Sequence, residues 1–176
     1  LELALTHSSY ANENKLKKNN ERFEFLGDSV LGFVTAEYLF TEYKNRPEGE
    51  MTKLRAAVVC EKSLFKFSEQ IDLGKYILLG RGEDSTGGRN RPSVVSDAFE
   101  AVLGAVFLDG GLEEARKLLV RFHFPRIPEI LSGPEFVNYK SQLLEYMQGH
   151  ALPVPEYKVI SESGPEHLKI FEMEVY

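Results

Sequence analysis

The strongest constraint on this chain is a run of acidic residues that recurs at helical spacing among apolar ones. Within residues 20–31, Glu21, Glu24 and Asp28 follow one another at steps of three and four positions, which places them on one face of a helix. Carboxylates beside apolar packing residues are costly to bury unless a base or a metal ion compensates their charge. The segment therefore predicts a helix that offers its acids to a cation.

A second acidic pair, Asp97 and Glu100, has the same spacing within an apolar stretch later in the chain. Two such helices packed together would build a site lined by carboxylate oxygens, the ligands that magnesium prefers. The alternative is that acids at these spacings are exposed and form ion pairs with nearby bases on the surface of each helix.

The overall charge bears on which partners the chain can bind. The 176 residues carry a net charge of −6, which argues against nucleic-acid binding through a general basic surface. Divalent cations bound to a carboxylate site would reverse the local sign and reconcile an acidic protein with a polyanionic substrate. The single cysteine, Cys60, excludes an internal disulfide framework, and no stretch resembles a membrane span or secretory signal.

Apolar periodicity predicts that the first 132 residues are helical, with a long helix that starts after a capping Asn20 and ends before residues 45–47. Further helices are expected at about 52–59, 63–71, 93–108 and 112–122. The exception is the glycine-rich segment 80–92, which carries Arg81, Arg89 and Arg91 and is predicted to be a mobile, solvated loop.

After residue 132 the pattern changes. A helix carrying Leu143 and Leu144 is followed by two alternating segments, 157–161 and 168–176, which predict strands joined by a turn. The chain is therefore expected to combine an all-α part with a smaller α+β part.

The acidic helix resembles a known family signature. Residues 21–31, Glu-Arg-Phe-Glu-Phe-Leu-Gly-Asp-Ser-Val-Leu, are similar to the signature of the ribonuclease III endonuclease domain, and Asp97-Ala-Phe-Glu-Ala resembles its second acidic motif. Other matching segments occur in the same order as in the family, at residues 5–10, 54–59, 87–89 and 108–111.

This resemblance implies an all-α ribonuclease III endonuclease domain at residues 1–132. Residues 133–176 resemble the N-terminal part of a double-stranded-RNA-binding domain, with helix, strand and strand but without the third strand and last helix. Within that part, Gln142, Glu145 and His167 match positions that contact RNA minor grooves.

The resemblance also implies a catalytic site. Its metal ligands and catalytic residues would be Glu24, Asp28, Asp97 and Glu100. Glu21 and Glu48 are further candidates for a second ion, with Glu50 as a competitor of Glu48. The implied cofactor is magnesium, with manganese as a substitute, and no organic cofactor is expected.

The family cleaves double-stranded RNA to 5′-phosphate and 3′-hydroxyl ends as a homodimer in which each protomer cuts one strand. Phe23, Phe25, Leu26 and Val30 are the candidate interface residues. The implied context is cytoplasmic processing of ribosomal and messenger RNA.

Two alternatives remain. One is a noncatalytic RNA-binding or ribosome-associated relative of the same fold, although such a relative is expected to have replaced at least one of the acids. The other is a carboxylate metal-storage or redox bundle. The positions of His7, His123 and His150 disfavour this, because none follows a glutamate by three residues as di-iron bundles require.

Overall fold

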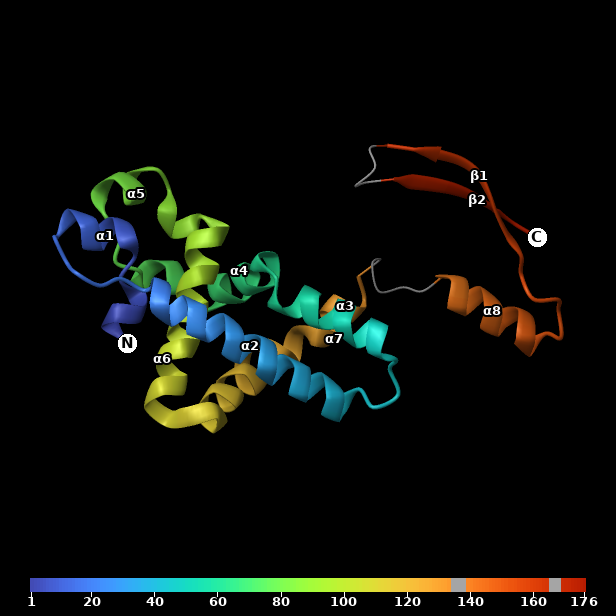
Figure 1. Ribbon diagram of the computed structural model, residues 1–176, viewed down its shortest axis with the longest axis horizontal. Coiled ribbons are helices and arrows are strands. Elements are labelled where there is room, and N and C mark those ends of the chain that lie inside the picture. The colour runs from blue at the N-terminus through green and yellow to red at the C-terminus, as the bar shows by residue number, and fades with distance from the viewer. Residues whose placement is uncertain (134–138, 165–168) are drawn as a thin grey trace. The chain divides into compact units, whose positions relative to one another are not determined.

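The computed structural model describes residues 1–133, 139–164 and 169–176, and the chain divides into two units, Leu1–Ser132 and Gly133–Tyr176. The first unit is built of helices (Figure 1). In chain order they are η1 (Glu2–Leu5), α1 (Ser8–Glu13), α2 (Glu21–Glu42), α3 (Glu48–Val59), α4 (Glu61–Gln70), η2 (Leu73–Tyr76), α5 (Arg81–Ser85), η3 (Gly88–Asn90), α6 (Pro92–Leu118), the π-helical η4 (Leu119–His123), η5 (Phe124–Arg126) and α7 (Ile127–Leu131).

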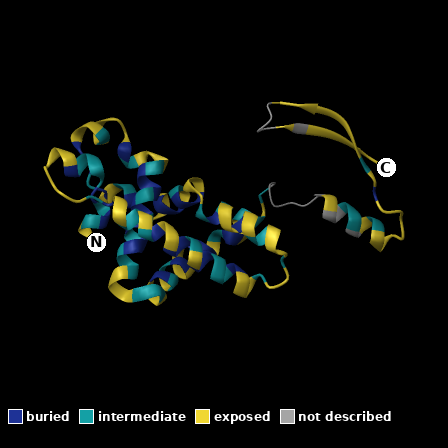
Figure 2. Ribbon diagram, in the orientation of Figure 1, coloured by how far each residue is buried: buried dark blue, intermediate teal, exposed yellow. Residues whose placement is uncertain are grey.

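The core of this unit forms where α2, α4 and α6 pack together. Leu31 and Val34 of α2 are fully buried, and Phe99 of α6 is 2% exposed. Phe67 of α4 meets Phe99 edge to face, with 5.1 Å between ring centroids. Figure 2 shows the buried positions gathered on the inward faces of these helices. Burial of these apolar side chains stabilises the crossing of α2 and α6.

Helix α6 is bent at Gly111, whose backbone angles of φ 78° and ψ −175° are not helical. The two helices predicted at 93–108 and 112–122 are therefore confirmed as the two halves of α6, which Gly111 separates and η4 follows. Beyond the bend, Arg116 donates from Nε to Glu37 of α2 at 3.0 Å, and Ala115 is fully buried. One helix thus contacts α2 through both of its halves.

The predicted cap of α2 is wrong in one detail. Asn20 precedes the helix, but its side chain makes no capping hydrogen bond, because its backbone is already helical (φ −79°, ψ −15°) and the residue is 3% exposed. The Oδ1 atom of Asn19 instead accepts a hydrogen bond from the backbone N–H of Glu21 at 3.2 Å.

The prediction of a solvated loop at residues 80–92 is also wrong, because this segment contains α5 and η3. Arg89 donates from Nη1 to the backbone carbonyls of Gly74 and Ile77, at 3.1 and 2.9 Å, and pairs with Asp84 at 2.7 Å. The guanidinium satisfies carbonyls that would otherwise lack donors. Its role is therefore structural, which glycine-rich composition alone does not indicate.

The second unit consists of α8 (Tyr139–Gly149) and the antiparallel strands β1 (Tyr157–Ser163) and β2 (Ile170–Val175). Tyr157 pairs with Val175, and the register shifts between Val159 and Ser161. The helical first unit and this helix-strand-strand unit confirm the predicted fold class. The side chains of Gln142 and Glu145, and the whole of His167, lie outside the described residues.

Within the part of the chain that the structure describes, no helix has both the length and the apolar character that a membrane crossing requires.

Candidate metal centre

The site begins with an unusually close approach of α2 and α6. A Cβ atom added at Gly27 of α2 would lie 1.8 Å from the carbonyl oxygen of Glu100, and one added at Gly104 of α6 would lie 2.3 Å from the carbonyl oxygen of Phe23. Only glycine leaves room for backbones this close. The two glycines therefore bring the acidic faces of the two helices together.

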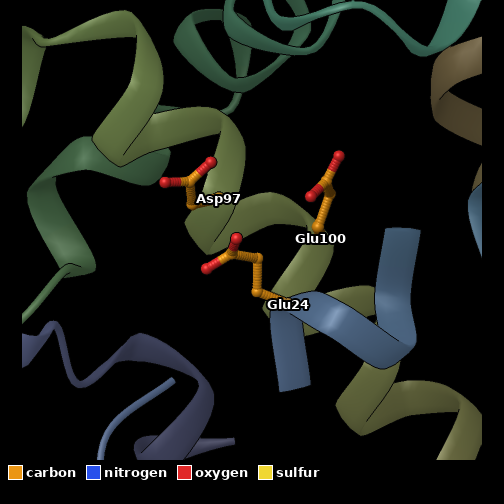
Figure 3. A group of neighbouring side chains, drawn as sticks. All are labelled: Glu24, Asp97 and Glu100. Atoms are coloured by element: carbon orange, nitrogen blue, oxygen red, sulfur yellow. The ribbon is translucent and has the colours of Figure 1, made fainter. Parts of the chain in front are cut away.

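Three carboxylates converge at this crossing. One carboxylate oxygen each from Glu24, Asp97 and Glu100 lies within 4.8 Å of the others. Figure 3 shows Glu24 on α2 and the other two on α6, with their carboxylate groups turned toward a shared space. All three residues are half-buried.

Burial and mutual repulsion make these acids hard to ionise together. Burial, and then the charges of Asp28, Asp97 and Glu24, raise the pKa of Glu100 to about 8. Burial, followed by the charge of Asp97 and then those of Glu21 and Asp28, also raises the pKa of Glu24. These carboxylates can therefore be ionised together only if a positive charge compensates them.

The residues present fit a hard divalent cation. None of the ion pairs formed among the described residues involves Glu24, Asp97 or Glu100. Half-buried carboxylates without basic partners are stabilised by a bound metal. Oxygen donors without nitrogen or sulfur ligands favour magnesium or manganese over the softer metals.

The other predicted acids occupy different places. Asp28 is exposed on α2 but acts electrostatically on both Glu24 and Glu100. Glu21 is exposed and raises the pKa of Glu24. Glu48 starts α3, accepts a hydrogen bond from Oγ1 of Thr52 at 2.8 Å and does not belong to the group.

The competing candidate Glu50 forms an ion pair with Arg46 at 2.9 Å. Within a single chain the structure therefore brings Glu24 of α2 together with Asp97 and Glu100 of α6 and leaves the acids of α3 outside this group.

The sequence did not indicate that the charges of Glu61 and His7 act on the site. Burial raises the pKa of Asp97, the charge of Glu61 raises it further, and His7 opposes the rise. Glu61 is the first residue of α4, and only the packing of α4 on α6 brings it near. Nδ1 of His7 accepts the backbone N–H of Ser9 at 3.2 Å, so this ring also caps the start of α1.

Known proteins resemble this chain over most of its length. A family model described as Ribonuclease-III-like matches residues 1–127. A protein of Syntrophomonas wolfei named Ribonuclease 3 is 49% identical over 99% of this chain and 74% of its own length. The Ribonuclease 3 of Oceanobacillus iheyensis is 48% identical over 99% of this chain and 77% of its own.

Solved structures show the same likeness. The nuclease domain of ribonuclease III from Campylobacter jejuni superposes with a TM-score of 0.66 at 45% identity, covering 70% of this chain and 86% of that one. Dicer from Pichia stipitis gives a TM-score of 0.52 at 27% identity, covering 88% of this chain and 73% of that one.

Proposed function

The chain belongs to the ribonuclease III family, and from this premise we propose that the carboxylates shared by α2 and α6 hold the divalent cation with which it hydrolyses double-stranded RNA. The ligand set is Glu24, Asp28, Asp97 and Glu100. The observation that carries the assignment is the convergence of three of these carboxylates within 4.8 Å. The cation is magnesium, for which manganese substitutes.

The proposed roles follow the family pattern, and burial distinguishes only the exposed Asp28 from the three half-buried acids. Glu24 and Glu100 bind the ion directly, and Asp97, which sits beside them on α6, is a ligand or positions a water. Asp28 is exposed and, at the open edge of the site, is a ligand or positions a water. When bound, the cation lowers the pKa of a water ligand and stabilises the departing oxygen. In-line attack then leaves 5′-phosphate and 3′-hydroxyl ends.

Glu21 is proposed to assist a second ion, because its charge acts on Glu24. Glu48 has no such contact within one chain, so we leave it outside the ligand set.

Residues 133–176 are proposed to be the N-terminal part of a double-stranded-RNA-binding domain. The helix followed by two antiparallel strands supports this. Its proposed contacts, Gln142, Glu145 and His167, would reach the shallow minor groove, where RNA is recognised by shape and 2′-hydroxyl groups. The proposed setting is the cytoplasm, with ribosomal and messenger RNA precursors as substrates.

The enzyme is proposed to act as a homodimer. The related Campylobacter structure concerns a region involved in dimer formation. In this chain, Phe25, Phe33 and Phe40 of α2 are 78%, 57% and 73% exposed and fall within an arc of about 80° on the helix. Exposed aromatic stripes of this kind are typical of protein interfaces.

The stripe changes the expected set of interface residues. Of the four candidates chosen from the sequence, Phe25 is exposed, whereas Phe23 and Leu26 are half-buried. Val30 is 6% exposed and belongs to the core of its own chain, so it is unsuitable as an interface residue.

Replacing Phe33 and Phe40 with serine is expected to convert a dimer into a monomer at micromolar concentration, because the apolar area that drives association is removed. Sedimentation velocity measures the change. The control is Phe122→Ser, which removes a phenylalanine that is 45% exposed on η4, and should remain dimeric. A wild-type protein that sediments as a monomer, or a double variant that stays dimeric, would contradict the assignment.

The function is tested by incubating a labelled RNA duplex with magnesium, with calcium or with a chelator, and mapping the product ends. We expect cleavage in magnesium but not in calcium or chelator, and products with 5′ phosphates and short 3′ overhangs. Duplex binding without cleavage under every condition would instead identify a noncatalytic relative and overturn the assignment of the site.

A further inference from the structure

A basic loop leads into the site helix. The segment between α1 and α2, residues 14–20, contains Lys15, Lys17 and Lys18 and no acidic residue. We call it the lysine loop. All three lysines are exposed, so the loop presents a local positive charge on a chain whose net charge is −6.

These lysines have no acidic partner in the described residues. The acid nearest to the loop on its N-terminal side, Glu13, pairs instead with Arg81, with Nε 3.2 Å from Oε1, and accepts the backbone N–H of Arg81 at 2.7 Å. No ion pair formed within the described part of the chain includes a lysine of the loop. Their charge is therefore available to a ligand.

The loop is held in place at both ends. At its start, the backbone N–H of Leu16 donates to the carbonyl of Ala11 at 2.8 Å. At its end, the N–H of Asn20 donates to the carbonyl of Thr6 at 2.9 Å, and the Asn20 carbonyl accepts the N–H of Glu24 at 3.0 Å. The last of these bonds joins the end of the loop directly to Glu24, one of the three converging acids.

We propose that the lysine loop binds the phosphate backbone of the RNA duplex beside the bond that is cut. This inference rests on the proposed function, because it names where the substrate of that site is held. Carboxylates repel the flanking phosphates of the duplex, because one or two bound cations neutralise only those at the site. Lysines in a loop whose backbone is bonded to that of Glu24 offset this repulsion. Phosphate contacts position a duplex without reading its sequence.

The location in the fold supports this role over that of an ordinary solvated surface. Figure 1 shows the loop entering α2 at the end of that helix that crosses α6. Helix α2 then runs to Glu42, so residues near its other end lie about 30 Å away along its axis. Basic residues there provide a matched control.

The test compares Lys17→Gln/Lys18→Gln with Lys44→Gln/Arg121→Gln. Each double variant removes two exposed positive charges that form no ion pair within the described residues. Arg121 lies on η4 near the other end of α2, where the ring of Tyr38 contacts that of Phe124 with 4.4 Å between centroids. Lys15 is left unchanged, because its left-handed backbone (φ 53°) makes substitution there a risk to the loop itself.

Two quantities are measured: KM for duplex cleavage, and the affinity for the duplex in calcium. Both are followed from about 50 to 200 mM salt, because affinity that depends on phosphate contacts falls strongly over this range. The loop variant should raise KM about tenfold and reduce the slope of log affinity against log salt by about two, while kcat changes little. The control variant should match the wild type. Equal KM and equal salt slopes for the two double variants would overturn the proposal.

The measurement separates this proposal from the proposed function. If the wild type binds duplex in a manner that depends on the loop lysines but never cleaves it, the loop assignment holds and the catalytic assignment fails. If the wild type cleaves and the loop variant behaves like the control, the catalytic assignment holds and the loop assignment fails. Absence of duplex binding by the wild type overturns the loop assignment.

Discussion

Replacing Glu100 with glutamine is expected to lower the turnover of duplex RNA by on the order of 100-fold or more, while the fold and RNA binding persist. Glu100 lies within 4.8 Å of the other two converging carboxylates, and the substitution keeps its shape while removing the negative charge that holds the cation. Single-turnover cleavage in saturating magnesium measures the loss. An unchanged rate would contradict the assigned role.

The same variant is expected to be more stable than the wild type in a chelator at pH 8. Burial and the neighbouring acids raise the pKa of Glu100 from 4.5 to about 8. Folding therefore disfavours its charged form, and the associated stability, present below pH 4.5, is lost as the pH rises toward 8. After allowance for solvent screening, the gain in unfolding free energy should be about 1–2 kcal/mol at pH 8.

Thermal unfolding in chelator between pH 5 and pH 8, a window fixed by that pKa shift, measures this effect. Wild-type stability should fall across the window, and that of Glu100→Gln should fall less. The control is Glu42→Gln, an exposed acid at the other end of α2, which should leave cleavage unchanged. A Glu100→Gln protein less stable than the wild type at pH 8 would mean that the carboxylate forms a compensating contact without metal.

Gly27→Ala is expected to have the largest effect on folding. The added Cβ would lie 1.8 Å from the carbonyl oxygen of Glu100, and because that atom is backbone, no side-chain rotation relieves the overlap. Helices α2 and α6 must move apart along the packed core. The free energy of unfolding should fall by at least about 3 kcal/mol, as measured by urea denaturation.

Gly49→Ala is the matched control, because a Cβ at this position in α3 meets no atom within 4 Å. Alanine is a better helix former than glycine, so this variant should equal or exceed the wild type by up to about 1 kcal/mol. Similar losses for both variants would show that helix propensity, and not the crossing of α2 and α6, accounts for the effect.

The acidic spacing was the part of the site that could be predicted. Three- and four-residue steps put Glu21, Glu24 and Asp28 on one helix face, and the structure indeed brings Glu24 together with the acids of α6. The close approach of the two helices at the crossing could not be foreseen, because Gly27 and Gly104 matter only through the backbone atoms that oppose them. Periodicity identifies an apolar face but not its partner.

The errors have the same origin. Glycine-rich composition suggested a loop at residues 80–92, whereas Arg89 binds carbonyls of a distant segment and supports two short helices. Likewise, Glu61 comes near Asp97 only through the packing of α4 on α6. Long-range contacts of this kind leave no local pattern in one sequence.

The bend at Gly111 separates two tasks of α6 that an unbroken helix would couple. In a continuous helix, inserting one residue turns everything beyond it by about 100°. Here Asp97 and Glu100 precede the bend, and Arg116, which pairs with Glu37, follows it. Because φ 78° and ψ −175° are open essentially to glycine alone, no other residue fits at Gly111. Insertions and deletions after it leave the direction in which Asp97 and Glu100 face unchanged.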